Sequence, residues 1–259
     1  MVDFTAAIRE NSALLHELVS GAAMEAPVPS CPGWTVADLT WHIAEVQHSW
    51  ASIVEDLLED PESGPKLERP CDAALPGLLV SRSARLVSAL SHRRDDEKCW
   101  SWHDRGHSVG WVRRRQAHEA LIHRVDAQLA VGDLPVVDSL LGADGVDEVL
   151  TYMIDIDDLP EWARYERDGT TARIDLGEAQ SWSMTLGRFV GKSPNSGNTY
   201  DFPALQLVPT LEHPTAVLRG SGPDLDLWLW GRGPLDPIEV EGPPEVPATI
   251  RAAAADATQ

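Results

Sequence analysis

Apolar residues recur every three or four positions through the first half of the chain, a pattern typical of helices with one buried face. This spacing predicts helices over residues 3–24, 35–58, 75–92 and 109–131, and one or two short helices around 145–165. Thr35 is a good N-cap for the second helix, with Asp38 at its third position, and Gly132 is a normal stop for the fourth. Four helices of these lengths predict an antiparallel bundle.

The pattern changes after about residue 168. Residues 168–191 alternate apolar and polar positions between glycines, and residues 213–221 form another apolar stretch, so both segments are predicted to contain strands. Ser221 and Pro223 open a further predicted helix, and a last helix is expected over about 244–255. The sequence therefore predicts an α+β protein with a helical domain at 1–166 and a smaller α/β domain at 167–259.

Composition narrows the classes of function. The chain has 259 residues, with 41 acidic against 21 basic side chains and a formal net charge of -20. Such a chain repels phosphate backbones and anionic lipids, so neither nucleic-acid binding nor membrane binding is expected. No apolar stretch approaches the length of a membrane helix, and the N-terminus does not resemble a signal peptide.

Three cysteines are present, Cys31, Cys71 and Cys99, and they form no C-x-x-C pair. An odd number of cysteines without such a pair favours a reducing compartment, so we expect a cytoplasmic protein.

Candidate chemistry is concentrated on the second and fourth predicted helices. Glu119 and His123 are four residues apart and therefore project from one face of a helix. Together with His42, two turns into the second helix, they would form a two-histidine, one-glutamate ligand set for a divalent ion. Three protein ligands of this kind leave one position for water or substrate, as in catalytic zinc sites.

Other interpretations of these residues remain open at this point. Arg115, Glu119 and His123 also have the spacing of an ordinary exposed ladder of charges, and a lone His42 is more often a core residue. The metalloprotease pattern H-E-x-x-H does not apply, because His118 and His123 are five residues apart and face different directions. We expect His118 to lie at the surface or behind the ligands.

Three segments carry a resemblance to a known family: PSCPGWTVADLTWHIAEV, WVRRRQAHEALIHRVDAQLAVG and DLDLWLWGRGPLDPIEVEG. In this order they resemble the mycothiol-dependent maleylpyruvate isomerases, an actinobacterial branch of the DinB-like metalloenzyme superfamily. The resemblance implies a DinB-like four-helix bundle followed by a sterol-carrier-like domain. It also implies that His42, Glu119 and His123 bind a divalent metal, zinc first, and that Arg232 is an active-site arginine.

The same resemblance implies an enzyme that uses a low-molecular-weight thiol such as mycothiol against a small electrophile, as an S-transferase or a cis–trans isomerase. In that case Asp126 would orient a metal ligand, and Arg232 would bind a substrate carboxylate. Asp126 also has the spacing to pair with a neighbouring arginine. We expect a monomer or a weak dimer.

Two alternative functions follow from the same residues. One is a metal-dependent hydrolase that uses water, and the other is a non-catalytic protein that binds a small ligand, with Trp228 and Trp230 lining the pocket. A zinc-sensing regulator is disfavoured, because the chain has neither cysteine ligands nor a basic surface for DNA.

Overall fold

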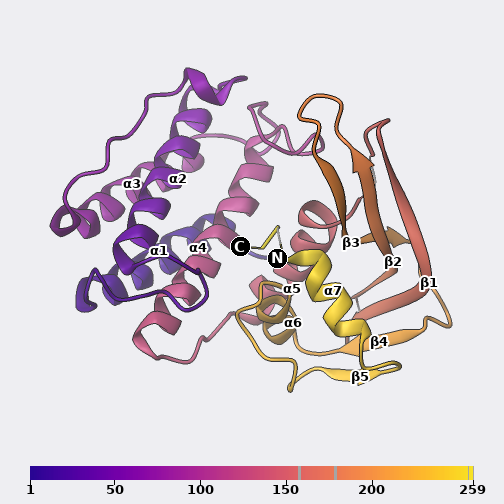
Figure 1. Ribbon diagram of the computed structural model, residues 1–259. Coiled ribbons are helices and arrows are strands. Elements are labelled where there is room, and N and C mark those ends of the chain that lie inside the picture. The colour runs from indigo at the N-terminus through magenta and orange to yellow at the C-terminus, as the bar shows by residue number, and fades with distance from the viewer. Residues whose placement is uncertain (157–158, 178–179, 256, 259) are drawn as a thin grey trace. The chain divides into compact units, whose positions relative to one another are not determined.

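The computed structural model describes residues 1–156, 159–177, 180–255 and 257–258, and it combines helices with one five-stranded sheet (Figure 1). This mixture confirms the predicted α+β class. The chain divides into two compact units, Met1–Val136 and Val137–Gln259. None of the helices in the described ranges has both the length and the hydropathy that a membrane span requires.

Four long helices make up the first unit, and two short 3₁₀ turns, Pro61–Ser63 and Asp72–Ala74, lie in the connection before the third of them. The helices are α1 (Phe4–Gly21), α2 (Val36–Asp56), α3 (Leu75–Ser91) and α4 (Val109–Val131). Both α1 and α2 contact α3 and α4, and the apolar faces meet in a core that contains Leu15, Leu39, Ile43 and Leu79. The predicted helix positions agree with these bounds to within a few residues.

Local signals explain where α2 and α4 begin and end. The Thr35 hydroxyl accepts a hydrogen bond from the backbone N–H of Asp38, and the Asp38 carboxylate accepts from the backbone N–H of Thr35, which confirms the capping box. Gly132 adopts a φ of 80° and ends α4 in the left-handed conformation that glycine tolerates. The two helices that carry the candidate ligands therefore have fixed limits.

The second unit contains the sheet and three further helices. Its helices are α5 (Ser139–Glu148), α6 (Gly222–Leu229) and α7 (Val246–Ala254), and a π-turn at Val149–Met153 follows α5. Its strands are β1 (Ala163–Leu176), β2 (Gln180–Lys192), β3 (Thr199–Val208), β4 (Ala216–Arg219) and β5 (Glu239–Glu241). They lie in the order β3-β2-β1-β4-β5, and only the β1–β4 pair is parallel.

The boundary between the units differs from the one expected at 166/167. It falls at Val136/Val137, because α5 packs against α6 and therefore belongs with the sheet rather than with the first four helices. The expected helical region also ends early, since β1 already begins at Ala163. Two strands were not expected from the sequence: β3, which lies between the two segments predicted to contain strands, and β5, whose three residues are too few to distinguish from a loop.

Candidate metal centre

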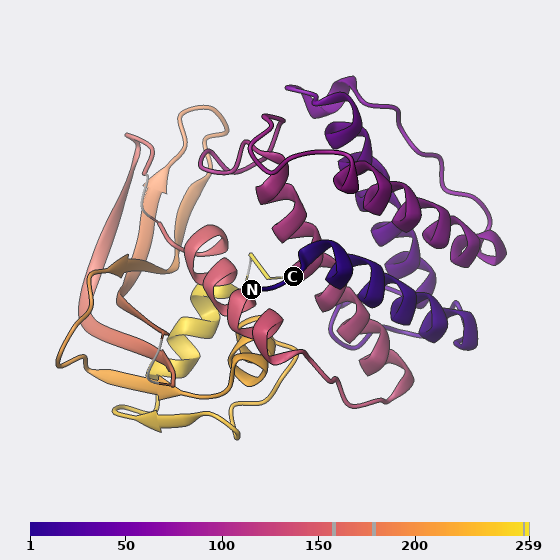
Figure 2. The same cartoon turned by 180° about the vertical axis from the view of Figure 1, so that it is seen from behind.

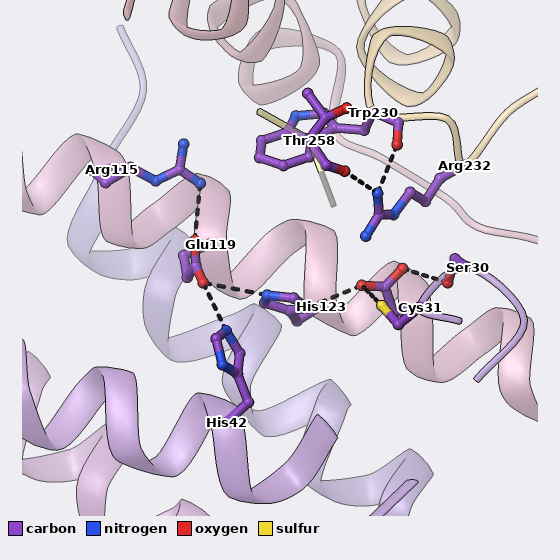
Figure 3. Close-up of polar contacts among 10 residues, drawn as sticks. Ser30, Cys31, His42, Arg115, Glu119, His123, Trp230, Arg232 and Thr258 are labelled. Carbon is purple, nitrogen blue, oxygen red and sulfur yellow. Dashed lines mark hydrogen bonds and ion pairs between the residues drawn. The ribbon is translucent and has the colours of Figure 1, made fainter. Parts of the chain in front are cut away.

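His42 of α2 and the Glu119–His123 pair of α4 lie close together in the first unit (Figure 3). Oε1 of Glu119 lies 3.4 Å from Nε2 of His42 and 3.2 Å from Nε2 of His123. One potential ligand atom from each residue lies within 4.8 Å of the other two. The structure therefore brings together the three residues that the sequence singled out, and it brings them together through one nitrogen of each imidazole.

The helices explain this convergence. Residues four apart on α4 share a face, and α2 packs against α4, so His42 approaches that face from the neighbouring helix. The His123 side chain is 8% exposed, that of Glu119 19% and that of His42 33%. His42 is therefore the most exposed member of the group, and His123 is the least exposed.

Asp126 contacts Nδ1 of His123, the ring nitrogen that does not face Glu119. Its Oδ2 lies 2.9 Å from Nδ1 of His123 and accepts a hydrogen bond from Cys31 Sγ at 3.4 Å, while its Oδ1 accepts one from Ser30 Oγ at 2.5 Å. A carboxylate can only accept, so it favours a proton on Nδ1 and leaves Nε2 as the nitrogen that faces Glu119. Asp126 is fully buried, which makes this contact stronger than it would be in water.

Trp34 packs against both imidazoles. Its ring is stacked on that of His123 at a centroid distance of 6.2 Å and lies tilted against that of His42 at 4.9 Å. Trp34 also borders the core cluster that contains Leu39. The sequence did not predict the contact of Trp34 with the two histidines.

The electrostatics of the group favour positive charge. Burial opposes ionisation of Glu119, but hydrogen bonds from His123 and His42, together with the charge of Arg115, hold the pKa of Glu119 well below 4.5. Burial would lower the pKa of His123, but its hydrogen bonds to Asp126 and Glu119 raise that pKa to about 9. The negative charge of Glu119 and Asp126 that stabilises this proton would also attract a metal ion, which would have to displace the proton from Nε2 of His123.

These residues fit a divalent ion. Two imidazole nitrogens and a carboxylate oxygen are a donor set that zinc accepts, and the Asp126 contact is of the type that orients metal-binding histidines. Cys31, His123 and Asp126 form a second close group that shares His123. Since Asp126 already bonds the Nδ1 side of His123, the group formed with Glu119 and His42 is the better candidate.

The structure modifies the alternative interpretations. Arg115 does contact Glu119, with 3.2 Å between Nη2 and Oε2, but the Arg115 side chain is only 4% exposed, so an exposed charge ladder is excluded. His118 is 1% exposed and lies edge-on to the ring of Phe4 on α1. Of the two positions that the sequence left open for His118, at the surface or behind the ligands, the surface position is therefore wrong, because α1 covers that side of α4.

Three residues that the sequence singled out, Arg232, Trp228 and Trp230, lie in the second unit. Arg232 follows α6, is 9% exposed, and donates from Nη1 to the backbone carbonyls of Trp230, at 2.7 Å, and Thr258. Trp228 and Trp230 are 4% and 6% exposed, so both are buried in the second unit.

Comparison with known proteins covers most of the chain. Residues 4–128 match the family model described as the mycothiol maleylpyruvate isomerase N-terminal domain. Residues 141–249 match the family model of the corresponding C-terminal domain. No curated protein matches the sequence significantly.

Two solved structures share the fold. One is the crystal structure of the mycothiol-dependent maleylpyruvate isomerase, which is 16% identical over 93% of this chain and 94% of that chain, with a TM-score of 0.55. The other is a histidine-to-alanine mutant of that isomerase, with the same identity and coverage and a TM-score of 0.53.

Proposed function

Because the chain belongs to the mycothiol-dependent maleylpyruvate isomerase family, we propose that it is an enzyme with a divalent metal, zinc first, held by His42, Glu119 and His123. It would use a low-molecular-weight thiol such as mycothiol on a small electrophile, as an S-transferase or a cis–trans isomerase. The observation that carries this proposal is the convergence of Nε2, Oε1 and Nε2 from these three residues.

The residues around the ligands have distinct parts in this proposal. When bound, the metal would lower the pKa of a coordinated thiol, which supplies the nucleophile. Asp126 accepts from Nδ1 of His123, which would leave Nε2 available to hold the ion. Arg115 donates to Oε2 of Glu119, which would leave Oε1 available to hold the ion. The rings of His42 and His123 are held in place by Trp34.

Two finer assignments belong to the same proposal. The four helices of the first unit would constitute a DinB-like bundle, and the second unit a sterol-carrier-like domain. Arg232 would bind a carboxylate of the electrophile, since a guanidinium matches a carboxylate with two parallel hydrogen bonds. If Arg232→Ala leaves both kcat and KM unchanged, this role is removed.

Metal analysis tests the ligand set. Zinc content would be measured in the purified protein and in His42→Ala, Glu119→Ala and His123→Ala, with His92→Ala as the matched control. His92 is an exposed residue at the end of α3. We expect stoichiometric zinc in the wild type and the control and a large loss in the three variants. Stoichiometric zinc in all three variants would refute the assignment.

Turnover assays distinguish the reaction classes. The zinc-loaded protein would be incubated with a panel of electrophiles, including maleylpyruvate, with and without mycothiol, and the products identified by mass spectrometry. Thiol-dependent turnover that is lost in Glu119→Ala supports the proposal. Turnover that needs no thiol identifies a hydrolase instead, and a protein that binds metal but turns over nothing in the panel favours the non-catalytic alternative.

A further inference from the structure

A groove of about 580 Å³ runs between α1 and α3 in the first unit. The two helices contact each other directly, and Figure 2 shows them in indigo and purple. Small or short side chains line the groove, among them Ala13 of α1 and Val80, Ala84 and Val87 of α3. Val80 is 48% exposed, and Ala13 and Ala84 are exposed. These side chains leave an apolar face on which another helix can approach closely.

Buried hydrogen bonds connect the two helices beneath the groove. Gln47 of α2 is fully buried and donates a hydrogen bond to Ser12 of α1 at 2.8 Å, while it accepts one from Ser83 of α3 at 2.5 Å. This bridge fixes the distance between α1 and α3 from below. The groove is therefore already formed in the folded chain, and an occupant would not have to open it.

The charged residues of α1 that line the groove are placed symmetrically, with opposite signs, about Ala13. Arg9, Ala13 and Glu17 are successive members of one ridge of α1, four residues apart, and all three are exposed lining residues. Ala13 lies midway, about 6 Å along the helix axis from each charged residue. If two copies of α1 packed antiparallel across Ala13, each Arg9 would lie opposite the Glu17 of the other copy. Among the described residues, neither charge is engaged in an ion pair within the chain.

The net negative charge of the chain makes the charge pattern of this groove significant. With a formal charge of -20, two copies of the chain repel each other over most of their surface. Glu17 is the one acidic side chain among the residues that line the groove, and Arg9 and His16 accompany it. The net charge of this face is therefore close to zero. A two-fold rotation would place Arg9 of each copy opposite Glu17 of the other.

The size of the face agrees with weak association. An α1 of 18 residues is about 27 Å long, and two neighbouring helices span about 20 Å. The face would therefore bury roughly 500 Å² on each copy, or about 1,000 Å² in total, which is the lower limit for a specific interface.

We propose that the α1–α3 groove is a homodimerisation face, with α1 of one copy antiparallel to α1 of the other across Ala13. The two copies then form two symmetry-related Arg9–Glu17 pairs, and Val80 and Val87 flank the contact. This proposal does not depend on the proposed catalytic function.

Charge reversal tests the proposal in the full-length protein. Sedimentation equilibrium of the wild type would be compared with Arg9→Glu, Glu17→Arg, the double variant Arg9→Glu/Glu17→Arg, and Ala13→Arg. Glu68→Arg supplies the same charge change at an exposed position away from the groove. Circular dichroism would verify the fold of each variant; the substituted residues are exposed, so all are expected to fold.

We expect a reversible dimer at roughly 100 µM protein, with a dissociation constant in the micromolar range. Each single reversal should weaken the dimer by about tenfold, because symmetry turns two attractions into two repulsions. The double reversal should restore it to within about threefold, Ala13→Arg should abolish it, and Glu68→Arg should leave it intact. A wild-type monomer, a dimer indifferent to these substitutions, or a monomer that binds an apolar dye in the groove would overturn the proposal.

Discussion

Replacement of Asp126 by asparagine isolates the contribution of one buried charge to the proposed metal site. The change preserves shape and one acceptor oxygen, but it removes the negative charge 2.9 Å from Nδ1 of His123. A hydrogen bond to a charged group contributes about 1.5–3 kcal/mol and a neutral one about 0.5–1.5 kcal/mol. The difference of about 1.5 kcal/mol corresponds to roughly tenfold in zinc affinity, at the lower end of the effects seen for such outer contacts.

Zinc affinity would be measured by competition with a chromogenic chelator at fixed pH. Asp133→Asn is the matched control, since it makes the same charge change at an exposed position just beyond α4. Ser30→Ala should have a smaller effect of the same sign, because Ser30 acts only by holding Oδ1 of Asp126. If folded Asp126→Asn protein binds zinc within about twofold of the wild type, the contact does not tune a metal ligand.

Three further predictions concern stability. Gly132→Ala should reduce the free energy of unfolding by about 1 kcal/mol, because a residue with a Cβ is disfavoured at a φ of 80°. A steric clash would not add to this cost, since a Cβ there would meet no other atom. An unchanged urea midpoint would contradict the prediction. Ile43→Ala should cost about 2–5 kcal/mol, since Ile43 is fully buried in the core of the first unit, and a loss below 1 kcal/mol measured in urea would be inconsistent with the packing described. Hydrogen bonds from Arg69 and Thr35 lower the pKa of Asp38 from 3.8 to about 2. The stability that Asp38 contributes is therefore present above about pH 4 and is lost as pH falls toward 2, so the stability difference between wild type and Asp38→Asn should shrink over that range.

The sequence alone determined the helices that carry the candidate site. The capping box of Thr35 and Asp38 and the stop at Gly132 are local signals, since each depends on backbone groups within a few residues. The shared face of Glu119 and His123 likewise follows from helix geometry. Such features are predictable because their partners are close in sequence.

Contacts between distant segments were decided only by the tertiary structure. Ser30 and Cys31 reach Asp126 across more than ninety residues, and no periodicity in the sequence relates these positions. The surface position, one of the two left open for His118, is wrong for the same reason, since α1 covers this residue. The domain boundary also moved, because α5 finds its apolar partner in α6 rather than in the preceding helices. Hydrophobic burial is non-directional, so a pattern shows that a face is buried, and only the packed chain shows against what.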